Sequence, residues 1–347
     1  MARRGDVMKK AIGAVRADSL LSVVTEIWRG AAAFAHGWTG GAPVRLFVSC
    51  LAAAGFAVVA LGVSPASAAE TETVELPLND LTLTGDLVRP DNIDMSQPVV
   101  LLVHGTFAHK NVELIEALQS ALAEREVASL AVTLSLGQNR REGMWDCNQP
   151  STHRHEDAVA EISAWVDWLG TEGYQGIVPL GHSRGGAQVA LWLARAGERA
   201  DIPAAVLLAP MTEDEGTAAA RYEQRFGAKL ADVLAEATAA KPDEMLEVPG
   251  LVYCSETKAT AQSMLSYHAE NPERDTPTLL TQGVSMPVLV ISASEDEVVT
   301  DLPERLAPIV DGAKIRLETV EGADHLFLDF FAEDAADLVA EHIAALP

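Results

Sequence analysis

Short, almost continuously apolar runs alternate with amphipathic segments along most of the chain. Runs typical of strands buried on both faces of a sheet lie at 98–105, 127–137, 176–181 and 204–210. Apolar residues at helical spacing fill the intervals, at 112–124, 157–170 and 187–196. Strands that alternate with helices predict an α/β fold, with a mostly parallel central sheet covered by helices on both faces.

The alternation of strand and helix patterns is preceded by a hairpin pattern and is interrupted once. Residues 72–78 and 81–90 flank Asn79-Asp80 and predict an antiparallel hairpin. Residues 211–286 are polar and helix-prone, without a clear parallel strand, and we interpret them as a helical cap inserted over one end of the sheet. Alternation then resumes, with strands expected at 287–294 and 313–322 and helices at 302–310 and 329–345. One α/β domain is therefore expected over 69–347.

The N-terminal region, 1–68, carries a targeting pattern. An unbroken apolar run occupies 46–63, and Ala66-Ser67-Ala68 fits the small-x-small rule for signal-peptidase cleavage. This predicts a cleaved signal peptide and a secreted or periplasmic protein. The rival interpretation is a single membrane anchor, for which the run is marginally long enough. Because the preceding stretch is too long for a typical signal peptide, translation is hypothesised to begin near residue 44. Membrane contact is expected only through this region.

Charge and cysteine content bear on the possible partners of the protein and on its compartment. The net charge of −25 argues against a nucleic-acid partner, because phosphate backbones require basic surfaces. Of three cysteines, Cys50 would leave with the signal peptide. Cys147 and Cys254 would remain in an oxidising compartment, either as one disulfide or as two buried thiols. If they are bonded, they would staple the cap to the core and limit its opening.

Gly181-His182-Ser183-Arg184-Gly185 stands between a predicted buried strand and a predicted helix. This context predicts a tight strand-to-helix turn that holds Ser183 in a strained conformation with its hydroxyl exposed. The alternative is a glycine-rich turn with an idle serine.

A serine hydroxyl needs a base to take its proton and a carboxylate to orient that base. His325 follows the last predicted strand and is the favoured base. Asp296 follows the preceding strand and is the favoured acid, with Glu295 and Glu297 as alternatives. Asp324 is interpreted as a turn residue.

Acyl transfer also needs two backbone donors for the oxyanion. The N–H of Arg184 follows from the turn, and the N–H of Thr106 is expected to supply the second donor because Gly105 permits a sharp bend. Phe107 is an alternative donor and a candidate wall of the acyl pocket. His104 is interpreted as a structural histidine rather than a second base.

From about residue 98 to the C-terminus the chain resembles the α/β-hydrolase superfamily. The resemblance rests on His104-Gly105, the turn 181–185, Asp296 in SASEDEVV and His325 in GADHLF, which occur in the expected order. It implies a serine hydrolase with an acyl-enzyme intermediate and no cofactor. A small-molecule acyl substrate, with a carboxylic ester as the favoured bond, is the expected partner. An acyltransferase, a carbon–carbon hydrolase and a non-catalytic binding protein remain as alternatives.

Thr152-His153-Arg154-His155-Glu156-Asp157 imitates a zinc-binding motif. Ala158 stands where that motif has another histidine, and no buried strand precedes it, so no metal site is expected. Asp157 is instead expected near the start of a helix, where acidic residues are favoured. The loop follows a strand end, and His155 is therefore a candidate substrate contact.

Overall fold

The computed structural model describes residues 69–91, 93–213 and 215–346. The predicted signal or anchor at 1–68, and with it the hypothesised start near residue 44, lies outside the described residues. Within the described ranges, none of the helices combines the length and the apolar character that crossing a membrane requires.

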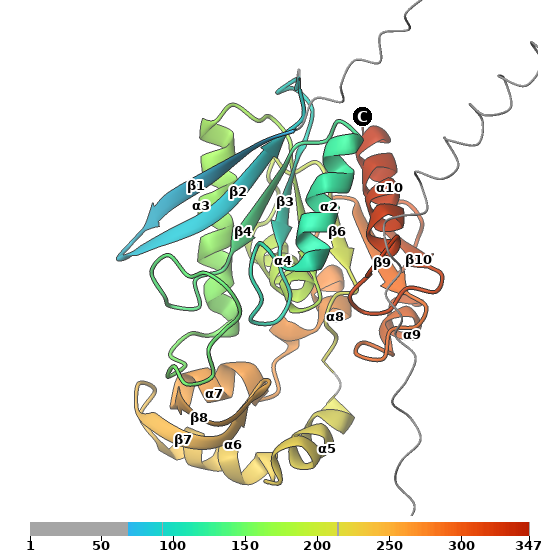
Figure 1. The fold of residues 1–347 in the computed structure, drawn as a ribbon. Helices are drawn as coiled ribbons and strands as arrows, with labels where there is room; N and C mark the ends of the chain where they lie inside the picture. Colours follow the sequence, from blue (N-terminus) through green and yellow to red (C-terminus); the bar gives the residue numbers. More distant parts are fainter. Residues whose placement is uncertain (1–68, 92, 214, 347) are drawn as a thin grey trace, which may run out of the picture. The chain divides into compact units, whose positions relative to one another are not determined.

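The centre of the fold is an eight-stranded sheet (Figure 1). Its strand order is β1-β2-β4-β3-β5-β6-β9-β10. The strands are β1 (Glu70–Leu78), β2 (Leu81–Arg89), β3 (Val99–Val103), β4 (Ser129–Thr133), β5 (Ile177–His182), β6 (Ala205–Leu208), β9 (Val288–Ala293) and β10 (Ile315–Val320). The six strands from β4 to β10 pair in parallel, whereas β1 and β2 pair antiparallel at one edge. The sheet is therefore mixed, and the predicted hairpin supplies its antiparallel part.

Alternate residues of the central strands feed two separate cores. In β3, Val99, Leu101 and Val103 belong to one apolar cluster, while Val100 and Leu102 belong to the other. Because side chains alternate along a strand, a continuous apolar run supplies both faces of a sheet. This is the physical reason why the unbroken apolar runs of the sequence predicted buried parallel strands.

Helices cover both faces of the sheet (Figure 1). One face carries α3 (Ala158–Thr171) and α4 (Arg184–Ala196), whose Trp165 and Trp192 lie in the first cluster. The opposite face carries α2 (Glu113–Glu124) and α10 (Phe331–Ala344), which lie side by side. Both layers agree with the predicted fold class.

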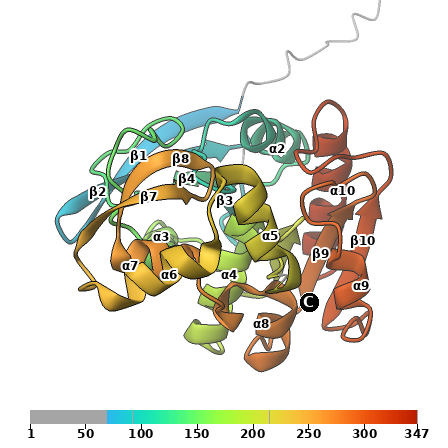
Figure 2. The ribbon, with the colours of Figure 1, turned by 90° about the horizontal axis from the view of Figure 1, so that it is seen from below.

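Residues 211–286 contain a strand pair in addition to helices (Figure 2). The elements are α5 (Glu215–Phe226), α6 (Leu230–Ala239), β7 (Met245–Leu251), β8 (Cys254–Thr260), α7 (Ala261–His268), the 3-10 turn η2 (Pro272–Arg274) and α8 (Thr276–Gln282). The antiparallel pair β7–β8 differs from the purely helical expectation. Its signal is the alternation of exposed Met245 and Glu247 with buried Leu246 and Val248, a period that helices do not have.

A third apolar cluster joins this segment to the sheet. It combines residues of α5 to α7 with Phe107, which follows β3, and Leu136, which follows β4. The segment from α5 to α7, here called the cap, therefore packs at the carboxyl ends of these strands. The last helix of the segment, α8, packs against the sheet domain instead. Its Leu279 and Leu280 belong to the first apolar cluster, and Gly283 approaches Ala194 of α4.

The loop between β4 and α3 is also tied to the cap. Cys147 of this loop forms a disulfide with Cys254 of β8, across 107 positions of the chain. Ser151 pairs with Ala259 of the same strand through a short parallel bridge. Of the two alternatives left open by the sequence, the structure has the disulfide.

Candidate active site

The turn after β5 has the backbone strain that its glycines suggested. Ser183 adopts φ 54° and ψ −120°, a conformation that residues with a side chain rarely occupy. A Cβ on Gly181 would lie 2.3 Å from the carbonyl oxygen of Gly185, and one on Gly185 would lie 2.3 Å from the carbonyl oxygen of His104. Both contacts are with backbone that cannot move aside, so the turn requires glycine at both positions.

Three side chains from three loops meet at this turn. His325 Nε2 lies 2.9 Å from Ser183 Oγ, and His325 Nδ1 lies 2.8 Å from Asp296 Oδ2. Because the carboxylate can only accept, Nδ1 carries the proton and Nε2 is free to accept from the serine hydroxyl. Ser183 is 8% exposed and His325 is 9% exposed, so the chain of hydrogen bonds is largely shielded from water.

The structure distinguishes the three adjacent carboxylates. Glu295 and Glu297 are exposed, whereas the side chain of Asp296 is 5% exposed. Asp296 Oδ1 accepts hydrogen bonds from the backbone N–H groups of Val298 and Val299 at 2.7 and 2.9 Å. Burial raises the pKa of Asp296, but the hydrogen bonds from His325 and these N–H groups outweigh it and hold the pKa below the ordinary value. Asp324 bonds its own turn at Leu326, as a turn residue does.

His182 is a site residue that the sequence reasoning did not identify. Its Nε2–H donates a hydrogen bond of 2.9 Å to the backbone carbonyl of His325. Burial lowers the pKa of His182 to about 4, so the ring is neutral near pH 7. The bond joins β5 to the loop that carries His325. The position of His182 at the end of β5 could have suggested this, because the carboxyl ends of parallel strands lie at the same edge of the sheet as the loop that carries His325.

The predicted oxyanion donors lie beside each other at the serine. A Cβ on Gly105 would lie 3.4 Å from Ser183 Cβ, which shows how closely the turn after β3 approaches this serine. Thr106 follows this glycine, and its Oγ1 accepts a hydrogen bond of 3.2 Å from Arg184 Nε. Arg184 begins α4, where backbone N–H groups have no partner within the helix. Thr106 and Arg184 both line the cavity at Ser183.

His104 holds the loop after β3 in place. Its Nδ1–H donates to the carbonyl of Gly105 at 2.8 Å, and its Nε2 accepts from the backbone N–H of Leu134 at 3.0 Å. Burial, followed by the charge of Arg141, lowers the pKa of His104 to about 3. The ring is therefore neutral and uses both nitrogens to join the ends of β3 and β4.

Phe107 lies in the third apolar cluster. It has φ 55° and is 2% exposed, with its ring against those of Trp145, His153 and Tyr267. It packs beneath the cap and is absent from the residues that line the cavity at Ser183. Its ring packs among residues of the cap interface, and it does not take the expected place in the lining of this cavity.

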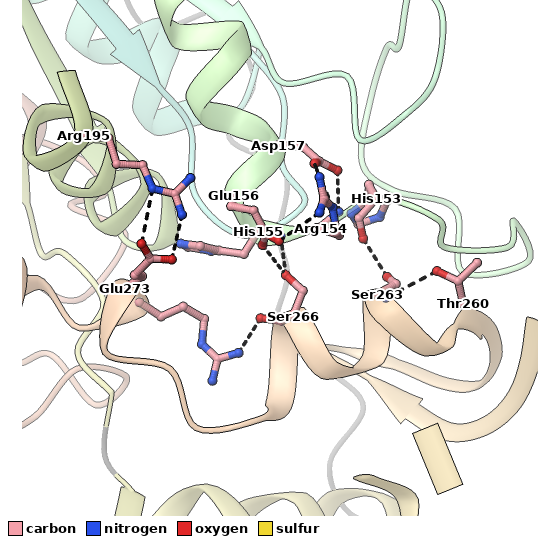
Figure 3. A network of polar contacts seen from close by, with 11 residues as sticks. His153, Arg154, His155, Glu156, Asp157, Arg195, Thr260, Ser263, Ser266 and Glu273 are labelled. Atoms are coloured by element: carbon pink, nitrogen blue, oxygen red, sulfur yellow. Dashed lines mark hydrogen bonds and ion pairs between the residues drawn. The ribbon is translucent and has the colours of Figure 1, made fainter. Parts of the chain in front are cut away.

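His155 also differs from its expected position. It opens the 3-10 turn η1 (His155–Asp157) and is 1% exposed, and its backbone N–H donates to Ser266 Oγ of α7 at 2.8 Å. Figure 3 shows this loop against α7, where Ser263 Oγ donates to the carbonyl of His153 at 2.7 Å. The imidazole is packed in the interface between loop and cap and does not line the cavity. A sequence pattern cannot anticipate this burial, because α7 comes more than 100 positions later.

The cavity at Ser183 has a volume of about 330 Å³. Its lining combines residues of the sheet domain, including Thr106, Ser183 and Arg184, with residues of the cap, among them Tyr222, Tyr267 and His268. None of these cap residues was identified from the sequence. They lie 39 to 85 positions from Ser183, within a polar segment whose packing no local pattern determines.

Comparison with known proteins gives a family and several similar folds. A family model described as "Alpha/beta hydrolase family" matches residues 100–342. Est1E from Butyrivibrio proteoclasticus, in a structure with bound ferulic acid, has a TM-score of 0.56 at 19% identity, covering 79% of this chain and 98% of that chain. Dienelactone hydrolase from Anabaena variabilis has a TM-score of 0.50 at 16% identity, covering 81% and 99%.

No curated protein matches the sequence. Because so few positions are identical, the two structural similarities concern the fold alone. The family model carries more weight, because it spans most of the chain, from β3 to α10. The chain belongs to the alpha/beta hydrolase family.

Proposed function

We propose that this protein is an exported serine hydrolase that cleaves a carboxylic ester through an acyl-enzyme intermediate. The observation that carries the proposal is the continuous hydrogen-bonded chain from Ser183 Oγ to His325 and Asp296, with distances of 2.9 and 2.8 Å. Nucleophile, base and orienting carboxylate are the three parts that acyl transfer by a serine requires.

In the acylation half, Ser183 Oγ attacks the ester carbonyl while His325 Nε2 takes the hydroxyl proton. Asp296 holds His325 in the required tautomer and stabilises the imidazolium that forms. The carbonyl oxygen becomes negatively charged and binds the backbone N–H groups of Thr106 and Arg184, an interaction worth about 3–4 kcal/mol per donor in related chemistry. His325 then gives the proton to the departing alkoxide, which leaves as the alcohol.

In the second half, water attacks the acyl-enzyme. His325 takes a proton from the water, and collapse of the tetrahedral intermediate returns that proton to Ser183 Oγ as the carboxylic acid departs. The names of the similar structures agree with ester-type chemistry, since a lactone is a cyclic ester. These names support the choice of bond without identifying the substrate.

A fluorophosphonate probe and an aryl ester test the proposal together. Wild type should form a phosphonyl adduct that maps to Ser183 and should hydrolyse 4-nitrophenyl butyrate. Ser183→Ala should lose the adduct and about 10⁴-fold or more of kcat/KM. Ser120→Ala is the matched control, because Ser120 is exposed on α2, and it should behave as wild type.

Failure of wild type to react under conditions that label a known serine hydrolase would contradict the mechanism. Continued ester turnover by Ser183→Ala would contradict the assignment of the nucleophile.

Export is supported by the apolar run at 46–63 with its small-x-small exit, and by the disulfide between Cys147 and Cys254. Disulfides persist mainly in oxidising compartments. N-terminal sequencing of the exported protein should find Ala69 as the first residue, and an intact 46–63 segment would indicate an anchor instead.

A further inference from the structure

The charges that line the cavity at Ser183 are unusual for so acidic a protein. Three arginines line it, at positions 184, 221 and 225, against two carboxylates, Glu213 and Asp301. The whole chain has a net charge of −25, so a cationic lining is not a consequence of overall composition.

Both carboxylates have hydrogen-bond partners other than Arg184. Glu213 forms a bidentate pair with the buried Arg274, with one contact at 2.7 Å. Asp301 accepts from Thr212 Oγ1 at 2.6 Å and lies 3.8 Å from Arg305. Glu213 is therefore paired with a cation other than Arg184, while Asp301 is held by a hydroxyl and shares Arg305, which lies closer to Asp275.

Arg184 is the arginine next to the nucleophile, and its charge is incompletely paired. Nε donates to Thr106 Oγ1, and the guanidinium lies 5.2 Å from the ring centre of Tyr267. Nη1 is completely buried and has no hydrogen-bond partner among the described residues, and within that part of the chain no carboxylate lies within ion-pair distance. Burial lowers the pKa of Arg184 to about 10, which still leaves it charged near pH 7.

An unpaired buried cation is costly, and native proteins rarely keep one without a use. A purely structural role, joining the core to the cap, would be met by the bond to Thr106 and the contact with Tyr267. It would leave the guanidinium charge without a carboxylate partner, which a substrate carboxylate in the cavity could supply. The position beside Ser183, on the cavity lining, makes a bound anion the simplest partner.

We propose that the natural substrate is an ester that carries a carboxylate near the scissile bond, and that Arg184 binds this carboxylate through its side chain. The inference rests on the proposed function and adds the substrate class to it. It also gives Arg184 two separate roles, since its backbone N–H serves the oxyanion and its guanidinium selects the substrate.

A pair of esters of equal shape and different charge tests this. Monoethyl succinate carries a carboxylate where ethyl 4-methylpentanoate carries an isopropyl group, and both can be followed by pH-stat titration of the released acid. Wild type should have at least a tenfold higher kcat/KM for monoethyl succinate. Arg184→Gln should reduce this ratio at least tenfold, and Arg184→Lys should restore part of it, because the charge returns without the planar fork.

The same comparison on the alcohol side uses O-butyrylglycolate and isobutyl butyrate. A preference for the anion in either pair that disappears in Arg184→Gln supports the inference. Arg195→Gln is the matched control, because Arg195 lies on the same helix but pairs with Glu273 outside the cavity. It should leave both ratios unchanged.

The outcomes separate this inference from the proposed function. If wild type cleaves the neutral esters and does not prefer either anionic ester, the inference is wrong and the hydrolase mechanism stands. If wild type cleaves no ester, calorimetric titration of Ser183→Ala with succinate decides the anion site by itself. Saturable binding that weakens at least tenfold when Arg184→Gln is added supports the site, and equal or absent binding in both proteins rejects it.

Discussion

Asp296 shows how the environment of a single residue selects one carboxylate out of three. Asp296 receives hydrogen bonds from His325, Val298 and Val299, while its two acidic neighbours point into solvent. The depressed pKa of Asp296 keeps this carboxylate ionised near neutral pH. Its role should therefore be separable from that of its neighbours by conservative substitutions.

Asp296→Asn should lower kcat for ester hydrolysis by about 10³–10⁴-fold, because the amide would hold His325 in the wrong tautomer. Glu295→Gln and Glu297→Gln remove the same charge from the adjacent positions and should change kcat less than about twofold. Steady-state kinetics of the three variants makes the comparison. If one of the Glu variants lost more kcat than Asp296→Asn, that glutamate would be the residue that orients His325.

At the scale of elements, the cap is held to the sheet domain by the loop between β4 and α3 as well as by its own chain connections. The disulfide and the bridge between Ser151 and Ala259 fasten this loop to β8. Since cap residues line the cavity at Ser183, this tether also helps to fix the position of part of its lining.

Replacing both cysteines, Cys147→Ser with Cys254→Ser, should lower the free energy of unfolding by about 2–4 kcal/mol, because the crosslink closes a long loop, spanning 107 positions, in the unfolded chain. Urea unfolding monitored by circular dichroism measures the loss. Limited proteolysis should cut the cap sooner in the variant. As a control, dithiothreitol should shift wild type to the midpoint of the double variant and leave the variant unchanged; a reductant effect on both proteins would indicate another cause.

Across the whole molecule, buried histidines make stability depend on pH. Burial lowers the pKa of His104, His153 and His268 to about 3 and that of His182 to about 4. Below pH 6.5 the unfolded chain protonates these rings while the folded chain resists, so the unfolded state binds more protons. Their contribution to stability is therefore complete above pH 6.5 and is lost as the pH falls toward 4.

His104→Gln should flatten this dependence, since glutamine can still accept from Leu134 but cannot titrate. Between pH 6 and 4 the slope of unfolding free energy against pH should decrease by up to about 1.4 kcal/mol per pH unit, the value for one proton. Chemical denaturation at half-unit intervals of pH provides the measurement. A slope equal to that of wild type would show that His104 is already charged in the folded protein.

Local sequence patterns were sufficient to predict the strands of the sheet, because each strand has its own apolar run within a single segment. The apolar runs predicted β3 to β6 and β9, and the turn residues Asn79-Asp80 predicted the edge hairpin, which the structure confirms. The strained turn at Ser183 was recognisable from a local motif, although only Gly181 avoids a contact within the turn, whereas Gly185 makes room for the backbone of His104 on the neighbouring strand end. The positions of His325 and of the acidic turn directly after predicted strands were enough to predict that both lie at the carboxyl edge of the sheet.

Only the tertiary structure decided the features that depend on packing between distant segments. It separated Asp296 from its neighbours, paired Cys147 with Cys254, and buried His155 and Phe107 under the cap. It also placed Arg184 against Tyr267, 83 positions away. The physical reason is that periodicity reports which side of an element faces apolar surroundings, whereas burial of a polar group depends on which other element covers it.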